Sequence, residues 1–328
     1  MARASHGIRS ASDDALPQIL SAADLLGLDV PTPDMLIDRI VPMRGASLIV
    51  GAAKSGKTLL AVQMALAVAS GRALFGVYTI QEPGPTLIIE QDDLGGAGSI
   101  KTILERSEVS MEGIPFYFTG QVPFEVGPEL VTWLVTEITK RSLRLIVVDS
   151  YTALRATRSG HIDIVKAEQS DLGLLDQIAK EHHCAIVVIH HTSKGSAGLD
   201  WAEKAAGTFA MSAATEAQIH ISRFRELEGA APERLVRVRG RHSEDVEMVL
   251  RFRKESLDYE HVLSGAAAPL YPELRQLQAT FGVRSFGVRE LCHATGISRS
   301  GAYRLLERLC RADVLRRQGY GEYVLMLT

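Results

Sequence analysis

Apolar residues gather in short, nearly unbroken runs along the first two thirds of the chain, and stretches expected to be helical separate these runs. The runs, most of them rich in Val, Ile and Leu, lie at residues 46–50, 86–90, 116–118, 143–149 and 185–190. Strands that are apolar on both faces are typical of a parallel sheet covered by helices on both sides. The helices are expected at residues 57–70, 100–106, 129–140 and 165–182. The pattern therefore predicts an α/β fold with a mostly parallel central sheet.

The pattern changes after residue 208. Residues 216–222, 235–239 and 246–252 alternate more between apolar and polar positions and lie close together, as strands and hairpins that extend a sheet do. A run of small residues at 263–270 predicts a linker. The expected organisation is a disordered N-terminus at 1–15, a large α/β domain at 16–262, this linker, and a small domain at 271–328.

Composition indicates a globular protein without a membrane segment. The 328 residues are 46% hydrophobic with a net charge of -3, and the longest apolar runs are far too short to cross a bilayer. The three cysteines, Cys184, Cys292 and Cys310, are isolated from one another, which is typical of the reducing cytoplasm. We therefore expect a cytoplasmic protein with no membrane partner.

Residues 51–58 match the phosphate-binding motif GxxxxGK[ST] in full. The motif follows a predicted strand and opens a predicted helix, so its backbone N–H groups and the helix N-terminus are expected to face phosphates. Lys57 is expected to contact the β- and γ-phosphates and Thr58 to hold Mg²⁺, which makes ATP and Mg²⁺ the expected cofactors. The predicted nucleotide-binding residues are Gly51, Ala52, Ala53, Lys54, Ser55, Gly56, Lys57, Thr58 and Leu59.

Two carboxylates follow other buried strands. Asp149 ends one run and is predicted to support Mg²⁺, although a turn-capping role is the alternative. Glu90 ends another run and is predicted to activate the attacking water. Gln91, Asp92 and Asp93 follow it directly, so that assignment is not unique, and a solvated loop acid is the alternative.

His190 and His191 end a third strand at the same expected edge. A histidine there can sense the γ-phosphate through a hydrogen bond. A structural histidine and a metal ligand are the alternatives. Adjacent side chains on an extended segment point apart, which disfavours a shared metal ion.

The small domain resembles a winged helix-turn-helix. Its second helix places Arg299, Ser300, Tyr303 and Arg304 on the outer face, where recognition helices contact DNA. Arg316 and Arg317 flank the turn of the predicted wing and are candidate phosphate contacts. Residues 270–328 contain nine Arg and five acids, a balance of +4 (9 minus 5). This charge favours DNA, and docking to a protein is the alternative.

Together, residues 51–58, Glu90, Asp149-Ser150 and the segment from His190 to Lys194 resemble RepA-type ATPases, which are RecA-fold relatives of hexameric plasmid replicative helicases. The resemblance covers about residues 16–260. It implies a ring hexamer with ATP between subunits and an arginine supplied by the neighbour. Residues 238–242 are similar to the segment that carries this arginine, so the resemblance assigns the role to Arg241 with Arg239 as helper.

Other readings of these residues remain open. Arg223 and Arg225 are rivals for the same role, because they too follow a strand, and a solvated surface charge is the alternative for each arginine. The resemblance implies an ATPase motor on DNA in plasmid, phage or mobile-element replication, with single-stranded DNA in the ring channel. Residues 193–204 are the candidate channel loop. The alternatives are an ATP-switched DNA-binding regulator and a helicase loader or recombination mediator.

Overall fold

The computed structural model describes residues 19–28, 34–92, 95–155, 164–191, 214–224 and 231–326. The chain divides into two compact units, Met1–Thr32 and Pro33–Thr328. The first contains α1 (Ala22–Leu26), a short helix that Ser21 and Asp24 cap reciprocally and that buries none of its own residues. The predicted disorder of residues 1–15 concerns residues outside the described part.

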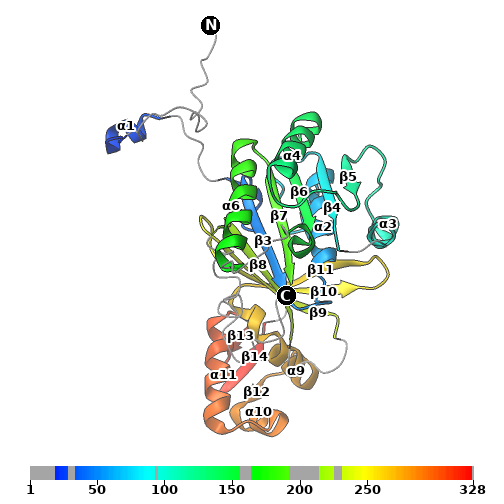
Figure 1. The fold of residues 1–328 in the computed structure, drawn as a ribbon. Helices are drawn as coiled ribbons and strands as arrows, with labels where there is room; N and C mark the ends of the chain where they lie inside the picture. The colour runs from blue at the N-terminus through cyan, green and yellow to red at the C-terminus, as the bar shows by residue number, and fades with distance from the viewer. Residues whose placement is uncertain are drawn as a thin grey trace. The chain divides into compact units, whose positions relative to one another are not determined.

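A nine-stranded sheet forms the framework of the second unit (Figure 1). Its order is β11-β10-β9-β8-β3-β7-β6-β4-β5. The strands are β3 (Gly45–Gly51), β4 (Thr86–Glu90), β5 (Phe116–Thr119), β6 (Leu145–Asp149), β7 (Ala185–His191), β8 (Ala217–Arg223), β9 (Glu233–Gly240), β10 (Val246–Arg253) and β11 (Asp258–Ser264). Pairing is parallel from β8 to β5, and β9, β10 and β11 continue as antiparallel strands. The predicted α/β class and mostly parallel sheet are confirmed.

Helices cover both faces of the parallel part, which explains why its strands lack polar positions. They are α2 (Lys57–Ser70), α3 (Gly96–Arg106), α4 (Pro128–Arg141), α5 (Tyr151–Leu154) and α6 (Ile164–Glu181). Side chains of one strand alternate between two cores. Ile49 packs with α2 residues such as Leu60, whereas Leu48 packs with α4 and α6 residues such as Leu130 and Leu172.

Several short or late strands were not predicted. A small hairpin, β1 (Met35–Ile37) and β2 (Val41–Pro42), precedes the first central strand. β11 adds an edge strand and runs to Ser264. Residues 265–270, in the predicted linker, form the 3₁₀ helix η2 (Gly265–Leu270). The domain boundary at this linker stays a prediction.

Residues 271–326, here called the C-terminal module, have a core of their own. The module contains α9 (Tyr271–Phe281), β12 (Phe286–Gly287), α10 (Val288–Thr295), α11 (Arg299–Arg311), β13 (Leu315–Arg317) and β14 (Glu322–Leu325). Its three strands pair in the order β12-β14-β13, and β12 is a further strand that was not predicted. Leu291, Leu306 and Leu309 are among the side chains buried between helices and sheet. The module thus contains the predicted helix pair followed by a β-hairpin.

Candidate active site

The ends of the parallel strands bring the predicted polar residues to one edge of the sheet. Glu90 and Asp149 are register partners on β4 and β6, and Val50 and His190 are partners on β3 and β7. The loop that follows β3 begins at the same edge. Open parallel sheets bind ligands in the region beyond the carboxyl ends of their strands, so the fold places these groups where a ligand site is expected.

The loop after β3 curls around the ammonium group of Lys57. Lys57 Nζ donates to the carbonyls of Gly51 and Ala52, each at 3.0 Å, and its side chain is buried. Gly56 has a φ of 100°, which a residue with a Cβ rarely adopts. Burial lowers the pKa of Lys57, whereas Asp149 and Asp92 oppose this effect. A cation inside a curl of backbone amides is suited to a phosphate chain.

Thr58 and Asp149 form the second element of the site. Thr58 Oγ1 donates to Asp149 Oδ2 at 2.5 Å, and Asp149 is only 4% exposed. Hydroxyl and carboxylate oxygens are the ligands that Mg²⁺ prefers. The described residues contain no group of three or more His, Cys, Asp or Glu able to hold a metal alone. The pair therefore fits a Mg²⁺ ion whose other ligands are phosphate oxygens and water.

Glu90 is the carboxylate beside this pair. It is 4% exposed, and its Oε1 accepts the backbone N–H of Asp92 at 3.0 Å. The Gln91 side chain instead exchanges two hydrogen bonds with the backbone of Val122, at 2.6 and 3.2 Å, and Asp92 is exposed. The structure thus separates three of the four candidates by environment, and Asp93 lies outside the described residues. Glu90 is the one held at the strand end.

His190 lies next to the loop strand. Its ring centroid is 6.1 Å from that of Tyr151, and the side chain is half-buried. His191 is the last residue of β7, but its side chain and residues 193–204 lie outside the described part. The phosphate-sensing role of both histidines stays a prediction.

A family model described as "AAA domain" (AAA_25) matches residues 12–197, which is more than half of the chain. The chain belongs to this AAA domain family. Its phosphate loop, Glu90, Asp149 and both histidines all fall inside the matched residues. The match and the sheet topology together identify the core of this AAA domain protein as a RecA-like P-loop ATPase fold.

Two solved structures resemble this AAA domain protein. One is the ATPase domain of another protein, with a TM-score of 0.53 and 12% sequence identity, and the match covers 67% of this chain and 86% of that chain. The other is the RadB recombinase, with a TM-score of 0.47 and 19% identity, over 68% of this chain and 93% of that chain. The likeness to the solved ATPase domain is one of fold.

Arg239 and Arg241 lie at the opposite edge of the sheet from the phosphate loop, because β9 runs antiparallel to β8. Arg241 Nη1 lies 3.6 Å from Glu216 Oε1, and Arg239 Nε donates to Asp245 at 3.1 Å. The rival Arg223 lies at the loop edge and donates to the carbonyl of Lys54 at 3.3 Å. Arg225 lies outside the described residues. Neither Arg239 nor Arg241 is therefore near the phosphate loop of its own AAA domain.

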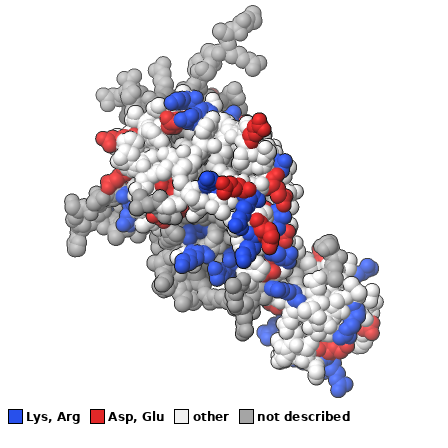
Figure 2. Space-filling model, turned by 90° about the vertical axis from the view of Figure 1, so that its right-hand side faces the viewer, with Lys and Arg blue, Asp and Glu red and all other residues white. Residues whose placement is uncertain are grey.

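The C-terminal module displays the predicted basic residues on its surface. Exposed side chains of α11 and β13 include Arg299, Ser300, Tyr303, Arg304, Arg316 and Arg317. Arg299 lies 6.0 Å from the ring centroid of Tyr303. Ala302, Leu306 and Leu309 face the core, as the helical spacing predicts. Figure 2 shows Lys and Arg side chains scattered over one face of the molecule, with acidic side chains among them.

Two residues near the phosphate loop were missed by sequence reasoning. Arg234 Nε donates to the carbonyl of Ser55 at 3.2 Å, and the hydroxyl of Tyr259 lies against Gly56. Both come from the antiparallel strands, about 180 and 200 positions later in the chain. Arg234 stands among the alternating residues of a hairpin, so the sequence contains no local signal of its contact. Across the described residues, no helix is long and apolar enough to span a membrane.

Proposed function

We propose that this protein hydrolyses Mg-ATP as a RecA-like motor acting on DNA. One observation carries the ATPase assignment. The phosphate loop, the Thr58–Asp149 pair and the buried Glu90 meet at one edge of the sheet. Phosphoryl transfer requires little beyond a phosphate cradle, a metal site and a group that orients the attacking water. These three parts meet that requirement.

Each residue of the site has a distinct role in this proposal. The loop amides and Lys57 bind the phosphates, and Mg²⁺ between Thr58 and Asp149 neutralises the charge that develops on them. Glu90 accepts the proton of the attacking water, and its burial favours a carboxylate able to take up a proton. His190 or His191 senses the γ-phosphate from the end of β7.

The proposal includes a ring, with six subunits as the resemblance implies. Topology supports a contribution from a second copy, because Arg239 and Arg241 lie at the edge away from their own loop. An arginine there can stabilise transferred-phosphoryl charge only across a subunit boundary. Both side chains are about half exposed, at 48% and 49%, and so are accessible to a neighbour.

The Lys57→Ala variant tests the phosphate loop. We expect ATP turnover to be lost, whereas Lys101→Ala, which removes an exposed lysine paired with Glu105, should retain it. Unchanged turnover in Lys57→Ala would refute the loop assignment. The trans role is tested by mixing Lys57→Ala with Arg241→Ala subunits. Recovery of turnover is expected, because an intact loop then meets an intact arginine, and no recovery contradicts a trans role for Arg241.

The C-terminal module is the proposed duplex-binding part, and single-stranded DNA is proposed to pass through the ring. We expect Arg304→Ala to lower duplex affinity several-fold and to reduce the salt slope by about 1. Arg284→Ala is the control, because Arg284 pairs with Glu290 at 3.0 Å and lies over Phe281. Equal losses in the two variants would remove the assignment of α11 as the DNA-contacting helix.

The exposed basic residues of the module also support a second function, that of an ATP-switched DNA-binding regulator, or of a loader or mediator that recruits another helicase. ATP turnover without DNA, with single strands and with duplex separates these functions. Fast turnover stimulated by single strands, with strand separation, supports the motor, and its proposed setting is plasmid, phage or mobile-element replication. Slow turnover with tight duplex binding supports the regulator. Mass measurements with and without nucleotide test the ring.

A further inference from the structure

The outer side of the phosphate loop rests on the antiparallel part of the sheet. Arg223 donates to the Lys54 carbonyl at 3.3 Å from β8, and Arg234 donates to the Ser55 carbonyl at 3.2 Å from β9. Two consecutive carbonyls of the loop are therefore bound by guanidinium groups of the same chain. A charged donor makes such a hydrogen bond about twice as strong as a neutral one.

Arg234 is built into this position. Only 9% of the residue is exposed, and its Nη1 donates to the carbonyls of Ala231 and Glu233, each at 2.8 Å. These two bonds hold the planar guanidinium in one orientation, which leaves Nε directed at Ser55. Burying a guanidinium is costly unless its donors are satisfied, so a role at the loop accounts for its presence among apolar strands.

The hydrogen bond at Ser55 constrains the peptide that follows it. In a trans peptide the carbonyl of one residue and the N–H of the next point in opposite directions. Because Arg234 holds the Ser55 carbonyl outward, the Gly56 N–H is directed to the other side of the loop. That is the side on which the amides of a phosphate loop meet the nucleotide.

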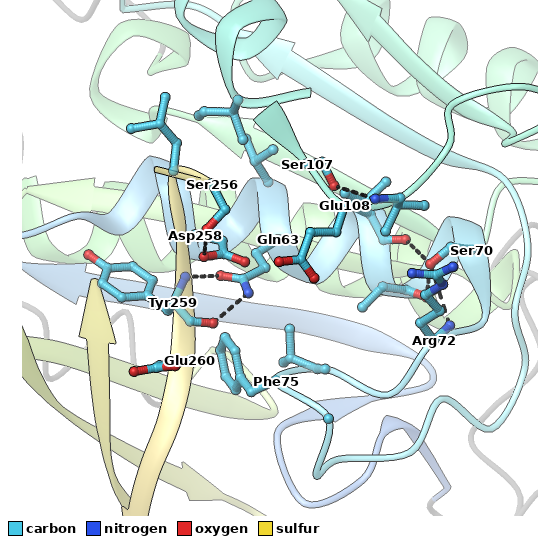
Figure 3. A pocket seen from close by; sticks show the side chains of 18 of the residues that line it. Gln63, Ser70, Arg72, Phe75, Ser107, Glu108, Ser256, Asp258, Tyr259 and Glu260 are labelled. Atoms are coloured by element: carbon cyan, nitrogen blue, oxygen red, sulfur yellow. Dashed lines mark hydrogen bonds between the residues drawn. The ribbon is translucent and has the colours of Figure 1, made fainter. Parts of the chain in front are cut away.

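Tyr259 supports the same point from β11. A Cβ at position 56 would overlap the Tyr259 hydroxyl and lie 3.1 Å from its Cζ atom, so the ring lies directly against Gly56. The Tyr259 backbone is itself held by Gln63 of α2. The Gln63 amide donates to the Tyr259 carbonyl at 2.7 Å and accepts its N–H at 2.9 Å (Figure 3). The edge strand is thus tied to the helix that the loop begins.

We propose that Arg234 and Tyr259 are positioning residues that hold the phosphate loop in its nucleotide-binding shape from outside the parallel core. The proposal rests on nucleotide binding at residues 51–58. It makes β9 and β11, which lie outside the matched AAA domain residues, part of the machinery for nucleotide affinity. Neither side chain is proposed to touch the reacting atoms.

The test compares Arg234→Ala with Arg237→Ala. Arg237 lies three positions further along β9 and pairs with Glu247 at 2.6 Å, which makes it a matched control. Affinity is measured with a fluorescent ATP analogue and Mg²⁺, together with the apo melting temperature and the turnover at saturating ATP. We expect Arg234→Ala to weaken nucleotide binding on the order of tenfold, as loss of a charge-assisted bond does.

A merely structural role would lower the melting temperature and leave the affinity of the folded fraction unchanged. The positioning role predicts the reverse, with turnover at saturation kept within a few-fold because Lys57, Thr58 and Glu90 are intact. Arg234→Lys retains one donor and should recover part of the affinity, and it also serves if the alanine variant does not fold. Tyr259→Phe keeps the ring and should lose less than Arg234→Ala.

The outcomes separate this inference from the proposed function. If the unaltered protein binds no nucleotide, the phosphate-loop assignment fails. If it binds, and folded Arg234→Ala and Arg234→Lys both bind as tightly as Arg237→Ala, the positioning role is overturned. A shared loss in Arg234→Ala and Arg237→Ala also overturns it, because the effect would then belong to the strand and not to the contact at Ser55.

Discussion

Replacing Gly96 with alanine should slow ATP hydrolysis without touching the nucleotide. Gly96 is the first residue of α3 and packs directly on the buried side chain of Glu90. A Cβ at this position would overlap Glu90 Cγ, lie 2.9 Å from Cδ and lie 3.2 Å from Oε2. No phosphate-loop atom lies within 4 Å among the nearest neighbours of that Cβ. The substitution therefore acts on the proposed water-activating carboxylate alone.

The size of the effect follows from the displacement. Moving Cδ from 2.9 Å to 3.4 Å, where ordinary contact begins, is a shift of about 0.5 Å, and Cγ must move further. Misplacement of a catalytic group by about 1 Å can lower a rate about 100-fold. We expect turnover at saturating ATP to fall by roughly 10- to 100-fold, equivalent to about 1.4–2.7 kcal/mol in the activation barrier. The Kd for ATP should change less than about twofold.

The matched control is Gly98→Ala on the same helix. No atom lies within 4 Å of a Cβ at position 98, so this variant tests the general effect of alanine in α3. Alanine in a helix interior is favoured over glycine by roughly 0.5–1 kcal/mol, so neither variant should lose stability through helix propensity. Single-turnover hydrolysis and equilibrium binding are measured on both. Equal turnover in the two variants would refute the role of Glu90 or the packing argument.

The remaining predictions concern the metal, pH and stability. Asp149→Asn should raise the Mg²⁺ concentration for half-maximal turnover roughly 10- to 100-fold, because an amide replaces the carboxylate beside Thr58, and a Mg²⁺ titration of turnover checks this. Burial lowers the pKa of Lys57 and phosphate attracts only its protonated form, so ATP affinity should fall with rising pH through a range below that of an ordinary lysine. Lys57→Arg should lack this fall, and identical pH profiles would contradict the assignment. Glu233→Ala removes a buried carboxylate that Tyr271 and two arginines contact, and should lower the unfolding free energy in urea by about 1–3 kcal/mol, against about 0.5 kcal/mol for Glu247→Ala. Similar losses in the two would refute the importance of the buried site.

The parallel half of the sheet was readable from the sequence because burial on both faces leaves a simple record. A strand such as β6 is apolar throughout until Asp149, so both the strand and its functional end stand out. The phosphate loop was readable for a different reason. Its residues are contiguous, and its glycines and Lys57 serve one local purpose. Glu90 and Asp149 were placed on neighbouring strands by the rule that parallel strands end at the same edge.

The antiparallel half was harder to predict because its contacts are distant in sequence. β11 alternates between partly buried and buried residues and has no unbroken apolar run, so it was missed. Arg234 would be interpreted as an exposed charge on a hairpin, and only the pairing of β8 with β3 brings its strand to the loop. Long-range pairing decides which face and which end a side chain occupies, and local patterns do not record it.

The position of β3 explains why binding and chemistry should respond to different substitutions. This strand lies between the parallel strands on one side and the antiparallel extension on the other, and the phosphate loop grows from its end. The parallel side supplies Glu90 and Asp149, which act on the attacking water and the metal. The antiparallel side supplies Arg234 and Tyr259, which contact only the outside of the loop. Gly96→Ala should therefore lower turnover with affinity retained, whereas Arg234→Ala should lower affinity with turnover retained. A single variant class that lowered both in parallel from either side would show that the loop does not divide the two halves in this way.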